Sequence, residues 1–444
     1  MKKVLLITAA VAVVITGCII VALSLTKNQA ISIKDNSGNE IAKVEFNYGV
    51  KVLCKDEAYK DYVEYCLDSC QKALDKDNLK NVTTIDTFFD IDIFTKVYNA
   101  TKAKQSEEEY ISVSITDLEG RVVTAYGDDE TQNRVMTKTY PGSALKPLSV
   151  YAPAIASGFI NWSSCFYDSP LKTVQGEDGS EQDWPVNAGN TYTFNKMTVC
   201  QALKTSTNTI AVDILDRYGC RISMNFLEEK LHMDLSEEKN IAFINGEEEV
   251  YGNIALGYLR GGVANVEMAG YYQIFANGGK YYYPTPIKTV YEGNNKVYEY
   301  NPNGEQVISE QTAAIMNKLL QEVFTQGGTA EIAAVDGIPL GGKTGTTDGF
   351  LNNWLVGFSP VYSCAVWCGS DDNVLASGTD SAKLVFKQIF ESLGAVTKEY
   401  PSCEGIQEYQ YCTYSGMLKS SNCANTALGY YTAENIPKFC NKNK

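Results

Sequence analysis

Hydrophobic residues are concentrated first in one long run near the start of the chain. Residues 4–25 (VLLITAAVAVVITGCIIVALSL) carry no charge, and 22 helical residues at about 1.5 Å each would cross a hydrocarbon core of roughly 30 Å. Lys2 and Lys3 precede the run, which predicts a cytoplasmic N-terminus and a body outside the membrane. The stretch ITGC suggests instead a lipoprotein cleaved before Cys18, but the apolar run continues for seven residues past that cysteine. The length favours an uncleaved, single-pass anchor in the cell membrane.

Beyond this run, the spacing of apolar positions predicts alternating helices and strands. Residues 110–127 alternate between apolar and polar and break at Glu119-Gly120, which predicts two strands joined by a tight turn. A hairpin is predicted around Asn36-Ser37-Gly38, and apolar residues recur at helical spacing over 56–76. Further helices are predicted at 143–157, 196–217 and 265–277, and a further strand pair at 352–370.

These elements divide the chain of 444 residues, which is long for one average domain, into four parts. The strands near both ends of the largest part, with helices between them, predict a mixed α/β fold with an antiparallel sheet flanked by helices. The predicted parts are a cytoplasmic stub and transmembrane anchor (1–27), a small N-terminal region or linker with an amphipathic helix (28–79), the large α/β domain (80–395) and a Cys-rich tail (396–444).

The charge balance excludes one class of partner. Lys and Arg number 38 against 53 Asp and Glu, and the resulting net charge of -15 is spread along the chain. Phosphate binding needs a concentrated basic face, so nucleic acid is not an expected partner.

Cysteine usage fits a compartment in which disulfides persist. Of 13 cysteines, one lies in the predicted anchor and twelve, an even number, lie outside it. No C-x-x-C pair occurs, so a zinc ribbon is not expected. No metal and no cofactor is predicted. Four cysteines close to the C-terminus predict a local disulfide framework of open pairing; they are Cys403, Cys412, Cys423 and Cys440.

The stretch TYPGSALKPLS (139–149) holds a candidate nucleophile. Ser143 follows a Pro-Gly turn at a predicted helix start, and Lys146 lies three residues later, on the same helix face. His232 is the single histidine and has the surroundings of a structural residue, so the base for a serine is expected to be a lysine or a carboxylate. Lys146 serves as base only if burial and a second cation lower its pKa. The S-x-x-K spacing alone is weak evidence, because it also occurs at Ser24, Ser69, Ser169 and Ser236.

Two more short motifs supply compatible side chains. Ser206 and Asn208 in KTSTNT place a hydroxyl and a carboxamide two residues apart. In LGGKTGTTDGF (340–350), Lys343 and two threonine hydroxyls are suited to binding an anion. We interpret the glycines of this segment as keeping a strand edge open for a peptide backbone. The glycine spacing does not match a P-loop.

The order S-x-x-K, S-x-N, K-T-G resembles the penicillin-recognising serine acyltransferases, which include class A β-lactamases and penicillin-binding proteins. The separations, 63 residues from Ser143 to Ser206 and 137 from Ser206 to Lys343, suit a full transpeptidase domain. Residues 80–444 resemble the transpeptidase part of class A penicillin-binding proteins; the segments that carry the likeness include DSPL, WPVN, ALGYLRGGVANVEMAGYYQIFANGGKYYYP and NNWLVGFSP.

The resemblance implies a serine D,D-transpeptidase that cross-links peptidoglycan stem peptides and is acylated by β-lactams. In that reaction Ser143 attacks the penultimate D-alanine carbonyl, with Lys146 as base. The other implied roles are proton relay by Ser206 beside Asn208, positive potential from Lys343, substrate binding by Thr344, Gly345 and Thr346, and an oxyanion hole formed by the backbone N–H groups of Ser143 and Thr346.

The resemblance is incomplete at the N-terminal side. Class A proteins carry a glycosyltransferase domain before the transpeptidase, and residues 28–79 are too few to hold one. We therefore expect a separate glycan polymerase as a possible partner. Asn353 also stands where the family often has Asp. Two alternatives stay open: a hydrolase of the D,D-carboxypeptidase or β-lactamase type, and a non-catalytic β-lactam sensor or scaffold.

Overall fold

The computed structural model describes residues 30–46, 50–76, 78–104, 109–175, 179–245, 248–347, 351–370 and 380–441. The predicted anchor at 4–25 and the alternative lipidation site at Cys18 lie outside these ranges. Within them, no helix combines the length and the apolar character that crossing a bilayer requires.

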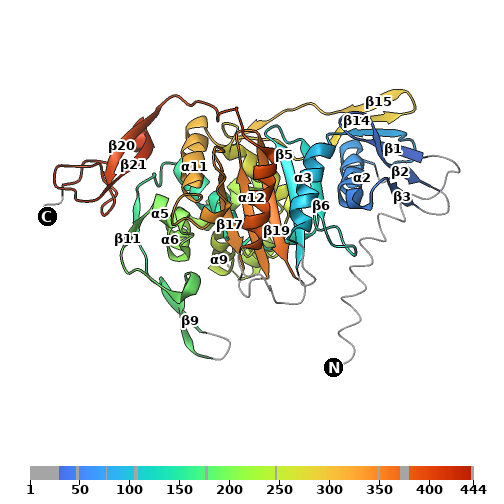
Figure 1. The fold of residues 1–444 in the computed structure, drawn as a ribbon. Helices are drawn as coiled ribbons and strands as arrows, with labels where there is room; N and C mark the ends of the chain where they lie inside the picture. Colours follow the sequence, from blue (N-terminus) through green and yellow to red (C-terminus); the bar gives the residue numbers. More distant parts are fainter. Residues whose placement is uncertain are drawn as a thin grey trace.

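The centre of the molecule is a five-stranded antiparallel sheet (Figure 1). Both predicted strand pairs are confirmed, since 110–127 forms β5 and β6 and 352–370 forms β18 and β19. In spatial order the strands are β17 (Gly341–Thr346), β18 (Asn352–Phe358), β19 (Tyr362–Gly369), β5 (Tyr110–Asp117) and β6 (Val122–Gly127). The K-T-G segment is therefore an edge strand.

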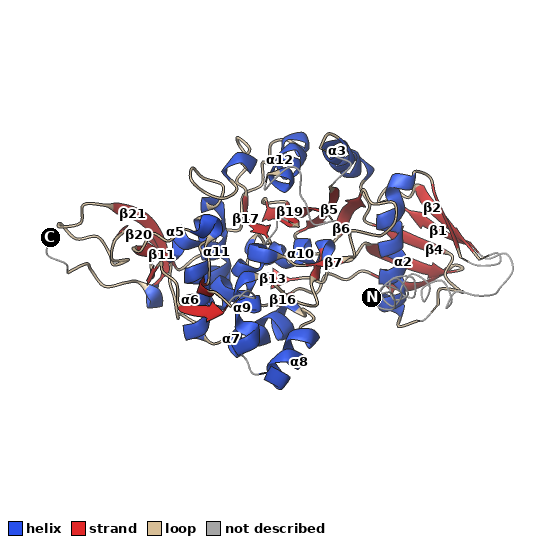
Figure 2. Cartoon of the chain, turned by 90° about the horizontal axis from the view of Figure 1, so that it is seen from below, coloured by secondary structure: helices blue, strands red, loops and turns tan. Residues whose placement is uncertain are grey.

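The central sheet is buried on both faces. Along β18, Trp354 and Val356 belong to one hydrophobic cluster and Leu355 to the other, because side chains alternate between the faces of a strand. Helix α10 (Asn265–Tyr272) covers the first face, and α3 (Ile91–Lys102) and α12 (Ser381–Leu393) cover the second (Figure 2). This arrangement confirms the predicted mixed α/β fold with an antiparallel sheet between helices.

A helical region lies beyond β17 and carries the serine segment. The α-helices described in this region are α4 (Ala152–Ala156), α5 (Val199–Lys204), α6 (Asn208–Tyr218), α7 (Cys220–Asn225), α8 (Ser236–Asn245), α9 (Glu248–Leu256) and α11 (Glu310–Glu322). Short strand pairs connect these helices: β7 (Lys138–Thr139) with β12 (Val263–Ala264), β8 (Cys165–Tyr167) with β11 (Lys196–Thr198), β9 (Lys172–Gln175) with β10 (Glu181–Trp184), and β13 (Lys280–Tyr281) with β16 (Glu305–Gln306).

Two predicted helices are more broken than their apolar spacing suggests. The expected helix at 143–157 consists of a 3-10 turn (Gly142–Leu145), a π turn (Pro147–Tyr151) and α4. The prediction of a single helix over 196–217 is wrong, because this segment forms strand β11 and two helices, α5 and α6. Ser206 lies between the two helices with a φ of +61°, a left-handed conformation that ends α5. Both helices face one core, so the helical spacing continues across the break.

The N-terminal region is a lobe of its own at one end of the molecule (Figure 1). Its six strands, in spatial order, are β15 (Asn295–Glu299), β14 (Ile287–Glu292), β4 (Thr84–Thr87), β1 (Ala30–Lys34), β2 (Glu40–Glu45) and β3 (Lys51–Cys54). The predicted hairpin around Gly38 joins β1 to β2, and α2 (Lys60–Leu74) occupies the predicted helix at 56–76. Because β4, β14 and β15 complete this sheet, the boundary expected at residue 79 falls inside the lobe.

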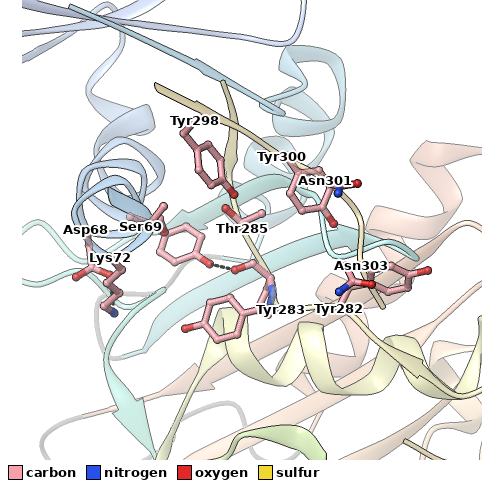
Figure 3. A pocket seen from close by; sticks show the side chains of 13 residues that line it. Asp68, Ser69, Lys72, Tyr282, Tyr283, Thr285, Tyr298, Tyr300, Asn301 and Asn303 are labelled. Carbon is pink, nitrogen blue, oxygen red and sulfur yellow. Dashed lines mark hydrogen bonds and ion pairs between the residues drawn. The ribbon is translucent and has the colours of Figure 1, made fainter. Parts of the chain in front are cut away.

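A tyrosine-rich groove runs between α2 and the segment that enters β14 (Figure 3). The Tyr65 hydroxyl donates a hydrogen bond to the Pro284 carbonyl oxygen at 2.7 Å and closes one wall. Tyr283 and Tyr298 line the groove, whose volume is about 370 Å³. None of the predicted site residues lies in its lining.

The C-terminal tail forms a hairpin at the opposite end from the N-terminal lobe (Figure 1). Its strands are β20 (Ile406–Cys412) and β21 (Thr426–Thr432). Ser163 of the helical region holds the hairpin, since its hydroxyl donates to the Gly416 carbonyl oxygen at 2.6 Å and accepts from Tyr431 at 2.8 Å. No disulfide joins Cys403, Cys412, Cys423 or Cys440 in this structure, so the disulfide framework expected in this tail is not formed.

Replacing Leu355 by alanine tests the double burial of the central sheet. Leu355 is fully buried on β18, so Leu355→Ala is expected to lower the free energy of unfolding by about 3 kcal/mol and to lower the melting temperature. Leu428→Ala is the matched control, because Leu428 is 42% exposed on β21. Equal melting temperatures for the two variants would contradict the assignment of Leu355 to the core.

Candidate active site

The serine lies in a tight turn at the entrance of the helical region. Ser143 is part of the 3-10 turn Gly142–Leu145, as its sequence position predicts, and is partly exposed. Gly142 has a φ of +53° and donates its N–H to the Gly257 carbonyl oxygen at 3.0 Å. A Cβ at Gly257 would lie 1.9 Å from the Gly142 carbonyl oxygen, so these two backbones meet without side chains. The turn is thereby fixed from the side of α9.

Strand β17 approaches the same turn from the other side. A Cβ at Gly345 would lie 2.3 Å from the Pro141 carbonyl oxygen, and one at Gly142 would lie 2.9 Å from the Thr346 carbonyl oxygen. Any side chain at Gly345 would separate the strand from the serine. Gly341 and Gly342 were expected to keep the strand edge open, but the structure gives another reason for glycine at these positions. A side chain at Gly341 would collide with the Phe358 ring of β18, and one at Gly342 with the Val356 carbonyl oxygen of the same strand.

Lys146 is fully buried directly behind the serine turn. Its Nζ donates to the Ser206 carbonyl oxygen at 2.8 Å and to Asn208 Oδ1 at 2.6 Å, and lies 3.5 Å from Ser206 Oγ. Within the described residues, no carboxylate lies within ion-pair distance of this amine. Its partners are neutral oxygens, which tolerate an uncharged lysine.

The break between α5 and α6 brings the S-x-N motif to the lysines. Ser206 Oγ accepts a hydrogen bond from Lys343 Nζ at 2.8 Å, while its carbonyl accepts from Lys146. Asn208 begins α6 and donates its amide to the Val186 carbonyl oxygen at 2.6 Å. One residue in a left-handed conformation thus connects both lysines.

Burial changes the protonation of both lysines. Burial, together with the nearby positive charge of Lys343, holds the pKa of Lys146 well below its ordinary value. Burial also lowers the pKa of Lys343, to about 7. The condition expected for a lysine base, a buried amine beside a second cation, is present.

The K-T-G strand continues the hydrogen-bond network away from the serine. Lys343 Nζ donates to the Thr344 carbonyl oxygen at 2.9 Å, and the Thr344 hydroxyl donates to Thr329 Oγ1 at 2.7 Å. Thr329 was not predicted as a site residue. Its loop, Gly327-Gly328-Thr329, has only its small residues as a signal in the sequence.

A second set of residues that the prediction missed holds the start of α6. Asn187 Oδ1 accepts the backbone N–H groups of Asn208 and Thr209 at 2.9 and 3.2 Å. Asp168 accepts from the Asn187 amide at 2.8 Å and from the Thr209 hydroxyl at 2.6 Å. Burial alone would raise the pKa of Asp168, but these hydrogen bonds, together with that from the Thr193 N–H at 2.7 Å, outweigh it and lower the pKa. They fix Asn208 against Lys146 from loops more than twenty residues away.

Two other residues have structural roles. Asn353 is buried and its Oδ1 accepts the Ala382 N–H at 3.1 Å, at the start of α12. His232 has an exposed side chain whose Nε2 lies 3.6 Å from Glu305 Oε2, which fits the expected structural role. The groups that meet at Ser143 are amines, hydroxyls and an amide, a donor set that does not attract a metal cation.

Comparison with known proteins identifies the class. The chain matches the family described as the penicillin binding protein transpeptidase domain over residues 96–391, which is more than half of its length. The chain therefore belongs to the penicillin-binding protein transpeptidase family.

Individual relatives agree with this assignment. Penicillin-binding protein 1A of Clostridium acetobutylicum is 31% identical over 299 residues, which cover 66% of this chain and 36% of that protein. Penicillin-binding protein 1A of Clostridium novyi is 31% identical over 382 residues, covering 81% and 43%. The chain thus spans less than half the length of these curated relatives.

Solved structures show the same fold. The PonA1 protein from Mycobacterium tuberculosis, in complex with penicillin V, aligns with a TM-score of 0.64 at 20% identity, covering 78% of this chain and 96% of that one. The D,D-transpeptidase domain of a peptidoglycan glycosyltransferase from Eggerthella lenta aligns at 0.60 and 17% identity, covering 83% and 100%.

Replacing Asn187 by alanine tests the support of α6. Asn187→Ala leaves two backbone N–H groups at the helix start without their acceptor, so stability is expected to fall by about 1 kcal/mol, a typical loss for a helix cap. The melting temperature measures this. Asn422→Ala, on the exposed surface of the tail, is the control and is expected to change nothing. An unchanged melting temperature for Asn187→Ala would show that the cap is dispensable.

Proposed function

We propose that this protein is a serine D,D-transpeptidase that cross-links peptidoglycan stem peptides through an acyl-enzyme and that β-lactams acylate the same serine. The observation that carries the proposal is the placement of Lys146. Its amine is fully buried beside the serine turn, bonds to the S-x-N residues and has its pKa lowered by burial and by Lys343. A neutral lysine is the base that serine chemistry requires here, because His232 lies elsewhere.

In the acylation step, Ser143 Oγ forms a bond to the carbonyl carbon of the penultimate D-alanine, and its proton passes to Lys146. The C–N bond to the terminal D-alanine then breaks. The Ser206 hydroxyl, 3.5 Å from Lys146 Nζ and 2.8 Å from Lys343 Nζ, relays a proton to the leaving amine. Asn208 keeps Lys146 in place through its Oδ1 and holds the substrate amide through its own amide group.

The negative charge on the carbonyl oxygen needs two hydrogen-bond donors. We assign them to the backbone N–H groups of Ser143 and Thr346. The assignment is supported by the backbone approach at Gly142, where a Cβ would lie 3.2 Å from the Thr346 nitrogen. One such donor contributes about 3 kcal/mol of transition-state stabilisation in acyl-transfer enzymes.

Strand β17 offers a binding edge for an extended peptide. It is the last strand of its sheet and pairs only with β18 among the described residues, so its outer edge is available for backbone hydrogen bonds with a stem peptide. The terminal carboxylate is then bound by Lys343 and by the hydroxyls of Thr344 and Thr346. Gly345 permits this approach, because a side chain there would strike the serine turn.

In the second step, an amine from a neighbouring stem peptide attacks the acyl carbon, the bond to Ser143 Oγ breaks, and the serine regains its proton. We further propose that the run at 4–25 anchors the protein in the membrane, with the catalytic domain outside, and that a separate polymerase supplies the glycan strands.

Labelling with a fluorescent penicillin tests the nucleophile. Wild-type protein is expected to be labelled covalently, and Ser143→Ala is expected to lose at least 99% of the label because no other hydroxyl lies in the turn. Ser236→Ala is the matched control, since Ser236 also precedes a lysine by three residues but is exposed at the start of α8. Label retained in Ser143→Ala, or absent from folded wild-type protein, would refute the acyl-enzyme. Product analysis with an added acceptor amine separates transfer from hydrolysis.

The pH dependence of acylation tests the coupling between the two lysines. The rate is expected to rise with pH as Lys146 loses its proton. In Lys343→Met the neighbouring positive charge is gone, so the pKa of Lys146 rises and the acid limb of the profile moves to higher pH. At neutral pH the acylation rate is expected to fall more than tenfold. Lys239→Met, an exposed lysine on α8, is the control. An acid limb at unchanged pH in Lys343→Met would show that Lys343 does not act on Lys146.

A further inference from the structure

Three cysteines of the C-terminal tail converge at one end of the β20–β21 hairpin. Cys412 ends β20, Cys423 lies in the turn before β21, and Cys440 lies on the final segment of the chain. The backbone N–H of Cys440 donates to the Leu418 carbonyl oxygen at 2.8 Å. The three sulfur atoms all lie within 4.8 Å of one another. Cys412 and Cys440 are buried and Cys423 is partly exposed. Three separate chain segments thus present their thiols to one point.

The number of thiols argues against a simple disulfide framework. Cys403, the fourth cysteine of the tail, is not part of the group, and its thiol bonds instead to the Glu404 carbonyl oxygen at 3.4 Å. Cys165, on the neighbouring β8, directs its thiol to the Ser163 carbonyl oxygen at 3.6 Å. A disulfide uses two sulfurs and would leave one buried or half-buried thiol of the group unpaired. A metal ion uses all three.

The spacing of the sulfurs suits a tetrahedral metal ion. Zinc binds thiolate sulfur at about 2.3 Å, so two sulfurs on one tetrahedral zinc are about 3.8 Å apart. That separation lies inside the 4.8 Å limit of this group.

Hydrogen-bond donors around the sulfurs fit thiolate ligands. The Ser415 hydroxyl donates to Cys440 Sγ at 3.3 Å, and the Ser420 backbone N–H donates to Cys423 Sγ at 3.4 Å. Donors directed at sulfur compensate its negative charge and orient the ligand, as groups around a metal's ligands generally do. The turn between Cys412 and Ser420 is therefore built to present sulfur atoms inward.

The size of the tail gives a physical reason for a metal. Besides the cysteines, its buried apolar side chains are Tyr411, Leu418 and Tyr431, and all three belong to the core of the helical region, so the tail has no separate apolar core. A two-stranded hairpin is marginally stable alone, and units of fewer than about 40 residues usually need disulfides, metals or packing against a partner. The helical region holds the hairpin from outside, through Ser163 and through the Asn161 amide, which donates to the Asn435 carbonyl oxygen at 3.1 Å. An ion bound by Cys412, Cys423 and Cys440 would join three segments of the tail to one another, which these contacts do not do.

We propose that Cys412, Cys423 and Cys440 bind one zinc ion as thiolates and that this ion holds the C-terminal tail in its folded form. Binding displaces three thiol protons, and the fourth coordination position takes a water molecule from solvent. Soft thiolate ligands select zinc over the hard cations magnesium and calcium. The argument against a zinc ribbon rested on the absence of C-x-x-C, and the proposed ligands are instead 11 and 17 residues apart. The site is independent of the proposed transpeptidase activity.

Metal analysis of the full chain tests the site. Protein purified in detergent with a reductant is incubated with zinc, freed of excess metal and analysed by elemental mass spectrometry. We expect about one zinc per wild-type chain and less than a tenth of that in Cys412→Ser and Cys440→Ser. Cys403→Ser is the matched control, a cysteine of the same tail outside the group, and is expected to keep its zinc. Substitution with cobalt should give thiolate charge-transfer absorption in wild type and Cys403→Ser alone.

Three outcomes would overturn the proposal. Wild-type protein that binds no zinc, or zinc that persists in both ligand variants, would show that the three thiols do not hold a metal. The third is a disulfide between two of these three cysteines in protein isolated from its native membrane without reductant, identified by peptide mass. Penicillin labelling of each variant reports separately whether the transpeptidase domain has folded, so loss of zinc through global misfolding is recognised.

Discussion

The candidate active site depends on two buried lysine amines that have no carboxylate partner among the residues the structure describes. Lys146 and Lys343 are fully inaccessible to solvent, and their hydrogen-bond partners are carbonyl, hydroxyl and amide oxygens. Such an environment disfavours the charged amine, so both pKa values fall. The unfolded chain binds these protons up to about pH 10, and the folded chain binds them only at lower pH. Below the pKa of free lysine, the two residues therefore lower the stability of the fold, and the loss grows as the pH falls. It stops growing where the folded state also takes up the protons.

A carboxylate near Lys146 would remove this loss of folding stability, but it would also remove the ability of Lys146 to accept a proton. An ion pair holds a lysine in its charged form, which has no lone pair to accept a proton. Where a carboxylate could stand, the chain places two neutral oxygens, the carbonyl oxygen of Ser206 and Asn208 Oδ1. The rest of the fold supplies the stability that this arrangement costs, chiefly through a central sheet with apolar residues on both faces.

Much of this architecture could be predicted from local patterns. The strand pairs at 110–127 and 352–370 have strong alternation, and the hairpin at Gly38 has an ordinary turn sequence. The side chains of Lys146, Ser206, Asn208 and Lys343, which were predicted to act together, do meet in the structure. Their meeting could be predicted because three short motifs in a fixed order indicate one fold far more specifically than any single motif does. Among the described residues, the Ser143 hydroxyl makes no side-chain hydrogen bond to this network. Ser143 lies next to the network because its turn leads directly into Lys146.

What was missed depends on contacts between distant segments. Apolar spacing continues through the break at Ser206, and the left-handed residue there is a serine, without the glycine or proline that normally indicates an interruption. Asp168 and Asn187 lie in polar loops, where capping residues of another segment look like any surface residue. The six-stranded lobe also escaped prediction, since its strands come from residues 30–54, 84–87 and 287–299.

The helical region and the sheet each hold part of the site, and this division explains the close contact of their backbones. Ser143, Lys146, Ser206 and Asn208 belong to the helical region, whereas Lys343 belongs to the edge of the sheet. Lys343 bonds to Ser206 at 2.8 Å across the junction. That short reach is possible because Gly345 and Gly142 bring β17 against the serine turn. A side chain at Gly345 would move the strand outward and separate Lys343 from Ser206. Gly142 and Gly345 therefore set the distance between Lys343 and Ser206, although neither glycine contributes a side chain to that hydrogen bond.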